Sequence, residues 1–66
     1  MNAKYQTFYR ICDKEGKVLE EDYLRVHADS TGIRNLVKRI MKSWPNAHYA
    51  EYRIRGKAKM NTIANF

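Results

Sequence analysis

The spacing of apolar residues changes twice along this chain, and this change constrains the fold more than any other feature. Apolar and polar residues alternate up to about residue 28, recur at helical intervals between residues 33 and 44, and alternate again over residues 48–55. Alternation is typical of strands with one buried face, whereas recurrence every three or four residues is typical of an amphipathic helix. The sequence therefore predicts strands, then one helix, then a further strand.

The first two predicted strands form a hairpin. Residues 4–12 are rich in aromatic and β-branched side chains and predict the first strand, and residues 18–28 predict the second. Residues 13–16 are polar and end in glycine, which suits a short loop whose last residue, Gly16, has a positive φ. The acidic run at residues 20–22 interrupts the alternation, so we expect a bulge or a frayed start in the second strand.

The helix has a clear beginning and a clear end. Asp29, Ser30 and Thr31 are all good N-cap residues, and Pro45 cannot continue a helix, so the helix should end at about Ser43. Its apolar face is predicted to consist of Ile33, Leu36, Val37, Ile40, Met41 and Trp44.

These elements predict an α+β fold of ββαβ order. A connection that leaves the second strand, forms a helix and returns to the same sheet should be a right-handed crossover. We expect a three-stranded antiparallel sheet of order 2-1-3, with the helix packed on one face. The domain is predicted to cover residues 1–55, and residues 56–66 to form a basic C-terminal tail that is mobile or adds a weak strand.

Composition argues against several classes of protein. A chain of 66 residues with one cysteine, Cys12, forms one domain without an intrachain disulfide, and His27 and His48 lie far apart with no thiol cluster near either. We therefore expect no metal and no cofactor. The N-terminus lacks the apolar segment of a signal peptide, and no stretch is long and apolar enough to span a membrane. The sequence predicts a cytoplasmic protein in a reducing compartment.

Charge is distributed unevenly. The net charge is +6, but residues 1–29 carry five basic and six acidic side chains, whereas residues 30–66 carry eight basic and one acidic. Such asymmetry favours an anionic partner, which could be nucleic acid, an acidic protein surface or anionic lipid. The alternative is that the charge serves solubility, because a net charge of this size is ordinary in small domains.

The predicted sheet has one face covered by the helix and one open face. The core-facing set is Tyr5, Tyr9, Ile11, Leu24, Val26, Ala50, Tyr52 and Ile54. The open face should carry Phe8, Arg10, Tyr23, Arg25, His27, Tyr49, Arg53 and Arg55. Aromatic rings between arginines suit single-stranded nucleic acid, since the rings stack on bases and guanidinium groups hold phosphates. The alternative is that these side chains only cover the sheet as cross-strand pairs.

The helix and the tail add further basic residues. Arg34, Lys38 and Lys42 repeat every four residues, and the helix has no acidic residue to offset their repulsion. Either an anionic partner or a solvated helix face explains them. Lys57 and Lys59 extend the alternating basic residues that begin at residue 53, which could follow a phosphate backbone or protect an edge strand from aggregation.

Catalysis has little support in the sequence. The acidic residues 20–22 are consecutive and therefore point to different sides of a strand, and no nucleophile has a histidine close in sequence. No glycine-rich phosphate loop occurs. We expect a non-enzymatic binding protein.

Its partner should be nucleic acid, either DNA or RNA, or an acidic host protein, with a homodimer through a sheet edge as a further possibility. The predicted binding residues are Arg10, Tyr23, Arg25, Tyr49, Arg53, Arg55, Lys57, Arg34, Lys38 and Lys42.

The order of these features resembles that of the small RNA-polymerase-inhibitor proteins of T7-like phages. The shared markers are the strand-to-helix junction at residues 26–30, Trp44 followed by Pro45, and Arg53 and Arg55 in the last strand. The basic helix departs from the acidic helix of that family. The resemblance implies a compact protein of a phage or other mobile element that binds and inhibits a host protein, for example RNA polymerase or a defence complex.

Overall fold

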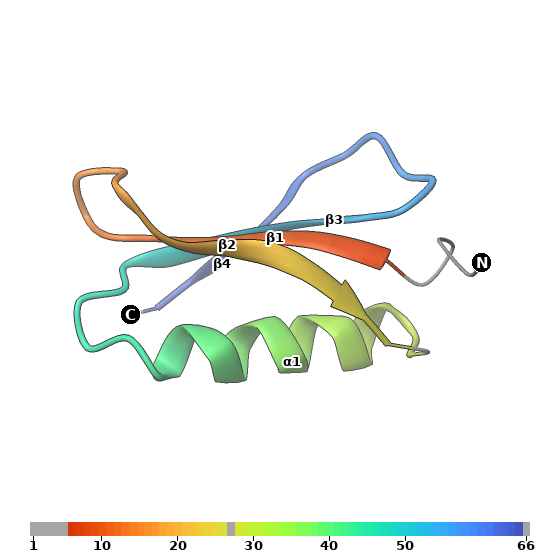
Figure 1. Cartoon of the computed structure of the whole chain (residues 1–66), viewed down its shortest axis with the longest axis horizontal. Helices are drawn as coiled ribbons and strands as arrows, with labels where there is room; N and C mark the ends of the chain where they lie inside the picture. Colours follow the sequence, from red (N-terminus) through yellow and green to blue (C-terminus); the bar gives the residue numbers. More distant parts are fainter. Residues whose placement is uncertain (1–5, 27, 66) are drawn as a thin grey trace.

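The computed structural model describes residues 6–26 and 28–65, so the predictions for Tyr5 and His27 lie outside the described residues. Four strands and one helix make up the fold (Figure 1). They are β1 (Gln6–Cys12), β2 (Val18–Arg25), α1 (Ser30–Lys42), β3 (Tyr49–Ile54) and β4 (Asn61–Ala64).

The strands form one antiparallel sheet of order β2-β1-β3-β4, and α1 lies across one face of it (Figure 1). The predicted α+β class, the 2-1-3 order of the first three strands and the single helix are confirmed. The prediction of three strands is wrong, because β4 adds a fourth beside β3. The edges of the described sheet are therefore β2 and β4, whereas β3 lies inside it.

Burial of one large side chain explains the fourth strand. Ile63 pairs with Ala50 of β3 and is only 1% exposed, so it belongs to the core under α1. Asn65 then closes the end of the strand, since its amide side chain donates to the Ala47 carbonyl and its backbone N–H donates to the His48 carbonyl, both at 2.9 Å. A four-residue strand is too short to show a period, which is why the sequence indicated this segment only as a mobile tail or a weakly added strand.

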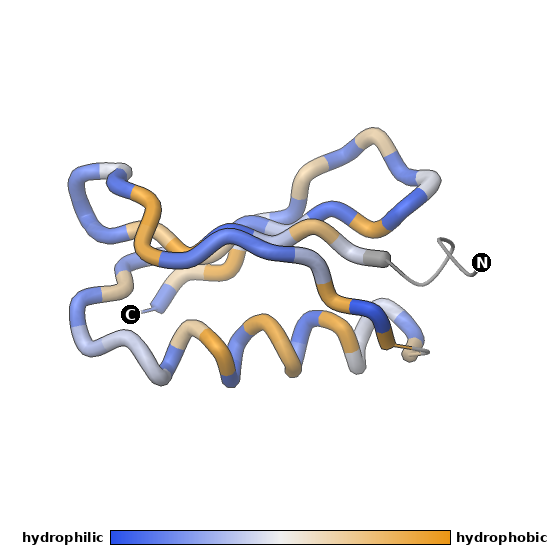
Figure 2. Tube along the Cα trace, in the orientation of Figure 1, coloured by the Kyte–Doolittle hydropathy of each residue, from blue (hydrophilic) through white to orange (hydrophobic). Residues whose placement is uncertain are grey.

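The core lies between α1 and the sheet. Its buried members are Tyr9, Ile11, Ile33, Val37, Met41, Ala47, Ala50, Tyr52 and Ile63. Partly buried side chains that pack around it are Leu19, Leu24, Val26, Ile40, Trp44 and Ile54. The predicted core face of the sheet is thus confirmed over the described residues. Figure 2 shows hydrophobic residues recurring along α1 between hydrophilic ones, as an amphipathic helix requires.

The β1–β2 hairpin has the predicted turn. Gly16 has a φ of 84°, and its N–H donates to the Asp13 carbonyl at 3.0 Å. The register shifts by one residue opposite Ile11 and Cys12, which pair with Glu20 and Val18, so Leu19 is the extra residue of a bulge. β2 ends at Arg25 instead of continuing to Ala28, because the chain must leave the sheet before it enters α1.

Both ends of α1 agree with the sequence. Asp29 is the N-cap, and its Oδ1 accepts a hydrogen bond from the Gly32 amide at 2.8 Å. Ser43 is the C-cap, and its hydroxyl donates to the Ile40 carbonyl at 2.6 Å. Within the described part of the chain, no helix is long and apolar enough to cross a membrane.

Candidate functional site

The strand register arranges the open face of the sheet in three successive rows. Alternation of side chains places every second residue of β1, β2 and β3 on this face. Read from β2 through β1 to β3, the rows are Tyr23–Phe8–Arg53, Glu21–Arg10–Glu51 and Val18–Cys12–Tyr49.

The first row joins two aromatic rings to an arginine. The Phe8 and Tyr23 rings meet edge to face, with centroids 5.5 Å apart and an interplanar angle of 64°. Tyr23 is 56% exposed, so much of its ring faces solvent. Arg53 flanks Phe8 from the other side and is also exposed. The predicted coincidence of aromatic and arginine side chains therefore occurs at this row.

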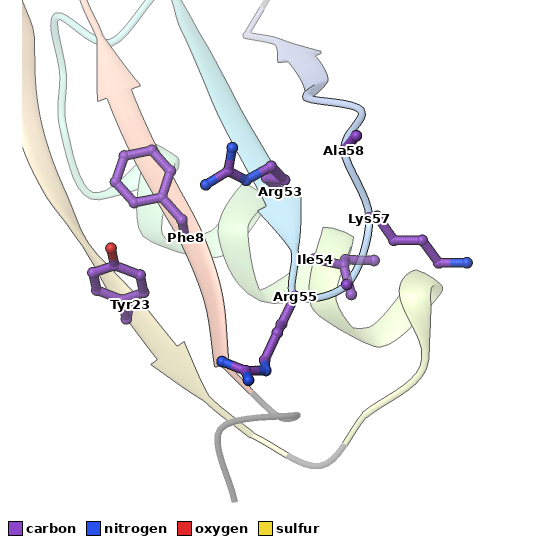
Figure 3. Close-up of a pocket in the computed structure, with 8 residues that line it drawn as sticks. Phe8, Tyr23, Arg53, Ile54, Arg55, Lys57 and Ala58 are labelled. Atoms are coloured by element: carbon purple, nitrogen blue, oxygen red, sulfur yellow. The ribbon is translucent and has the colours of Figure 1, made fainter.

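A groove of about 340 Å³ runs beside this row, where the chain leaves β3 (Figure 3). Gly56, with a φ of 85°, turns the chain, and the Lys57 N–H closes the turn by donating to the Ile54 carbonyl at 2.9 Å. We call it the sheet-face groove; its lining side chains are Phe8, Tyr23, Arg53, Ile54, Arg55, Lys57 and Ala58. Figure 3 shows the Phe8 and Tyr23 rings on one side and the basic side chains on the other.

Arg25 adds a positive charge beside this groove without lining it. It pairs with Gln6 two positions beyond Tyr23 on β2, and alternation puts it on the same face. Its side chain is exposed. Four of the predicted binding residues, Tyr23, Arg53, Arg55 and Lys57, line the groove, and Arg25 lies next to it.

The second row holds Arg10 in place between other side chains. Its Nε lies 3.3 Å from a carboxylate oxygen of Glu51, and its guanidinium carbon lies 5.5 Å from the centroid of the Phe8 ring. The contact with Glu51 is an ion pair without hydrogen-bond geometry, so the buried Nε makes no hydrogen bond to any described residue. Arg10 therefore forms an ion pair with Glu51 and a cation–π contact with the Phe8 ring.

Tyr49, in the third row, lies away from the sheet-face groove. Four residues of extended strand separate it from Arg53, a distance of about 13 Å. The neighbouring Cys12 thiol is the main cause that raises the pKa of the Tyr49 hydroxyl. Cys12 is 2% exposed. Tyr49 thus covers this end of the sheet, so the structure does not bring it together with the other predicted stacking residues.

The predicted basic residues of the helix lie on the other side of the sheet. Arg34, Lys38 and Lys42 are all exposed along α1. Lys38 and Lys42 do not line the sheet-face groove. Arg34 lines a second groove, which it shares with Lys57.

Sequence reasoning did not single out Glu20, which links two elements. Glu20 faces α1 from β2, where one carboxylate oxygen accepts a hydrogen bond from the Tyr9 hydroxyl and the other accepts one from Trp44 Nε1 at 2.7 Å. Burial and then this bond to Glu20 raise the pKa of Tyr9 well above its ordinary value of 10. The contacts identify Glu20 as a polar link between the sheet and the end of α1.

Known proteins offer no assignment for these features. No family model matches the chain, and searches of curated proteins and of solved structures also find no match. Among residues 6–26 and 28–65, no three His, Cys, Asp or Glu side chains gather as a metal site would require. The resemblance to phage polymerase inhibitors stays a prediction.

Proposed function

We propose that this protein is a non-enzymatic nucleic-acid-binding domain that holds a single strand in the sheet-face groove. Bases would stack on Tyr23 and Phe8, and Arg53, Arg55 and Lys57 would contact the phosphates. Every base has a flat π-face, so stacking of this kind tolerates many sequences. DNA and RNA are both candidate ligands.

The observation that carries this proposal is the exposure of Tyr23 at the edge of a basic groove. A cross-strand aromatic pair adds only about 0.2 to 1 kcal/mol to a sheet, and the contact with Phe8 covers one part of the Tyr23 ring. Tyr23 is 56% exposed, and the rest of its ring makes no contact with another described ring. Stacking of one base on such a ring contributes about 1 to 3 kcal/mol to binding.

Removal of the Tyr23 ring tests this role. We predict that Tyr23→Ala weakens binding of fluorescein-labelled 12-nucleotide oligo-dT or oligo-U about 5- to 150-fold, measured by fluorescence anisotropy at low salt. The matched control is Val18→Ala, because Val18 is also an exposed apolar side chain of β2, 41% exposed and away from the groove. Equal affinities of the two variants would contradict the stacking role.

A protein-binding inhibitor is the second candidate function, and the sheet edges favour it. β2 and β4 each have one side without a partner strand in the described sheet, so either edge could accept a strand from a partner protein. β3 offers no such edge, because β1 pairs with one side of it and β4 with the other.

Affinity capture from bacterial lysate, with and without nuclease, separates the two functions. Co-captured proteins that disappear after nuclease support the nucleic-acid function. One protein retained at a stoichiometric level after nuclease supports the inhibitor function.

A further inference from the structure

A second groove lies at the end of the molecule where α1 begins and where β3 connects to β4 (Figure 1). Its volume is about 360 Å³. We call it the helix-end groove; the lining side chains that matter here are Thr31 and Arg34 of α1, Tyr52 of β3, and Lys57 and Lys59 of the connection. The groove is thus assembled from segments far apart in the sequence.

The charge of this groove is positive. Arg34, Lys57 and Lys59 come from two separate segments, and no acidic residue of the described chain is among its lining residues. The first turn of α1 contains no acidic residue either. The nearby Asp29 carboxylate already accepts a hydrogen bond from the Gly32 amide. Three cations that line one groove repel one another, and a bound anion would offset this repulsion.

The groove also offers hydrogen-bond donors that bond to no described residue. Tyr52 is 5% exposed and lines the groove, yet its hydroxyl makes no hydrogen bond to any residue that the structure describes. The Ser30 and Thr31 amides, in the first turn of α1, likewise have no acceptor among residues 6–26 and 28–65. The amides of a helix N-terminus, together with its positive dipole, favour a bound anion.

We propose that the helix-end groove binds a phosphate group, supplied by the backbone of the same strand whose bases lie in the sheet-face groove. Ile54 and Lys57 line both grooves, so the two form one basic path around the end of the sheet. Figure 3 shows Lys57 pointing away from the Phe8 and Tyr23 rings, as a residue between two sites would. The identity of the ligand as nucleic acid rests on the proposed function above.

The first test compares two double variants that lose the same charge. We expect Arg34→Ala/Lys59→Ala to reduce the slope of log affinity against log salt for 12-nucleotide oligo-dT by about 1.4, which corresponds to two phosphate contacts. Lys14→Ala/Lys17→Ala, in the hairpin at the opposite end of the sheet, should leave the slope unchanged. Arg34→Lys should retain it because the charge remains.

If the wild type binds the oligonucleotide and both double variants behave alike, the helix-end groove is not a phosphate site, while the proposed function stands. If the wild type binds no oligonucleotide, the proposed function fails, and inorganic phosphate then tests the groove by itself. Titration with phosphate against chloride at equal ionic strength should shift the Ser30 and Thr31 amide resonances, and Tyr52→Phe should weaken this binding roughly fivefold. If phosphate leaves these resonances unchanged, the helix-end groove is not a phosphate site. If phosphate shifts them while the protein binds no oligonucleotide, the ligand is a free phosphate compound.

Discussion

At the scale of single residues, Glu20 forms the polar link between the sheet and the end of α1. It accepts hydrogen bonds from Tyr9, which is buried in the core, and from Trp44, which follows the end of α1. The link joins two residues 11 and 24 positions away from Glu20 in the sequence. A buried donor that loses its acceptor costs a fold more stability than the loss of a hydrogen bond at the surface.

We predict that Glu20→Ala lowers the free energy of unfolding by about 1 to 3 kcal/mol, since the Tyr9 hydroxyl and the Trp44 indole both lose their acceptor. Urea denaturation followed by circular dichroism measures the loss. Its neighbour Glu21 provides the control: it is exposed on the open face, and Glu21→Ala should change stability by less than about 0.5 kcal/mol. Similar effects of the two substitutions would refute the role of Glu20.

The raised pKa of Tyr9 predicts a loss of stability in alkali. Above pH 10 the Tyr9 hydroxyl ionises in the unfolded chain but keeps its proton in the folded protein, where burial and Glu20 oppose ionisation. The folded state then binds more protons, so stability falls as pH rises, by up to about 1.4 kcal/mol per pH unit.

The Tyr9→Phe variant lacks this titration. It should be less stable than the wild type at pH 8, where it loses the bond to Glu20, and the difference should shrink between pH 10 and 11. Denaturation curves of the wild type and of Tyr9→Phe are compared at each pH. The other tyrosines and the lysines titrate in both proteins, so their contributions cancel in the difference. A difference that stays constant with pH would contradict the assignment.

Local signals in the sequence were sufficient for the turn and the caps, but they could not reveal side-chain partners. Gly16 and Asp29 act on backbone groups within four residues, so the sequence alone indicated their roles. The pairings of Glu20 with Trp44 and of Arg10 with Glu51 depend on the register between distant segments. Arg10 was therefore predicted as a binding residue, although the structure pairs it with a carboxylate.

At the scale of elements, periodicity identified β1, β2, α1 and β3, and it placed their faces correctly over the described residues. It could not decide between a mobile tail and an added strand for β4, where Ile63 is the one large apolar side chain in four residues. The same ambiguity left the helix-end groove undetected, because Lys59 and the β3–β4 connection are positioned by the return of the chain to the sheet.

We predict that Ile63→Ala destabilises the protein by about 2 to 5 kcal/mol, the usual cost of truncating a buried isoleucine. This is a large share of the stability of so small a domain. Thermal unfolding followed by circular dichroism should show a much lower midpoint than in the wild type. Thr62→Ala, at the exposed neighbouring position, is the control, and equal midpoints for both variants would show that β4 does not contribute to the core.

At the scale of the whole molecule, the fold places five of the eight basic residues that follow residue 30 around one end of the sheet. The basic residues of both grooves, Arg34, Arg53, Arg55, Lys57 and Lys59, all come from this half of the chain. The β1–β2 hairpin carries most of the acidic residues. The sequence predicts an anionic partner from this uneven charge, and we propose that the partner binds at this end of the sheet.

The salt dependence of oligonucleotide binding tests this central claim most directly. The measurement compares the wild type, Arg53→Ala/Arg55→Ala and Lys14→Ala/Lys17→Ala, which lose equal charge at opposite ends of the sheet. Loss of two phosphate contacts should reduce the slope of log affinity against log salt by about 1.4 in the first variant and leave it unchanged in the second. Equal slopes in all three proteins, or no binding by the wild type, would contradict the proposal that this end of the sheet binds a nucleic-acid strand.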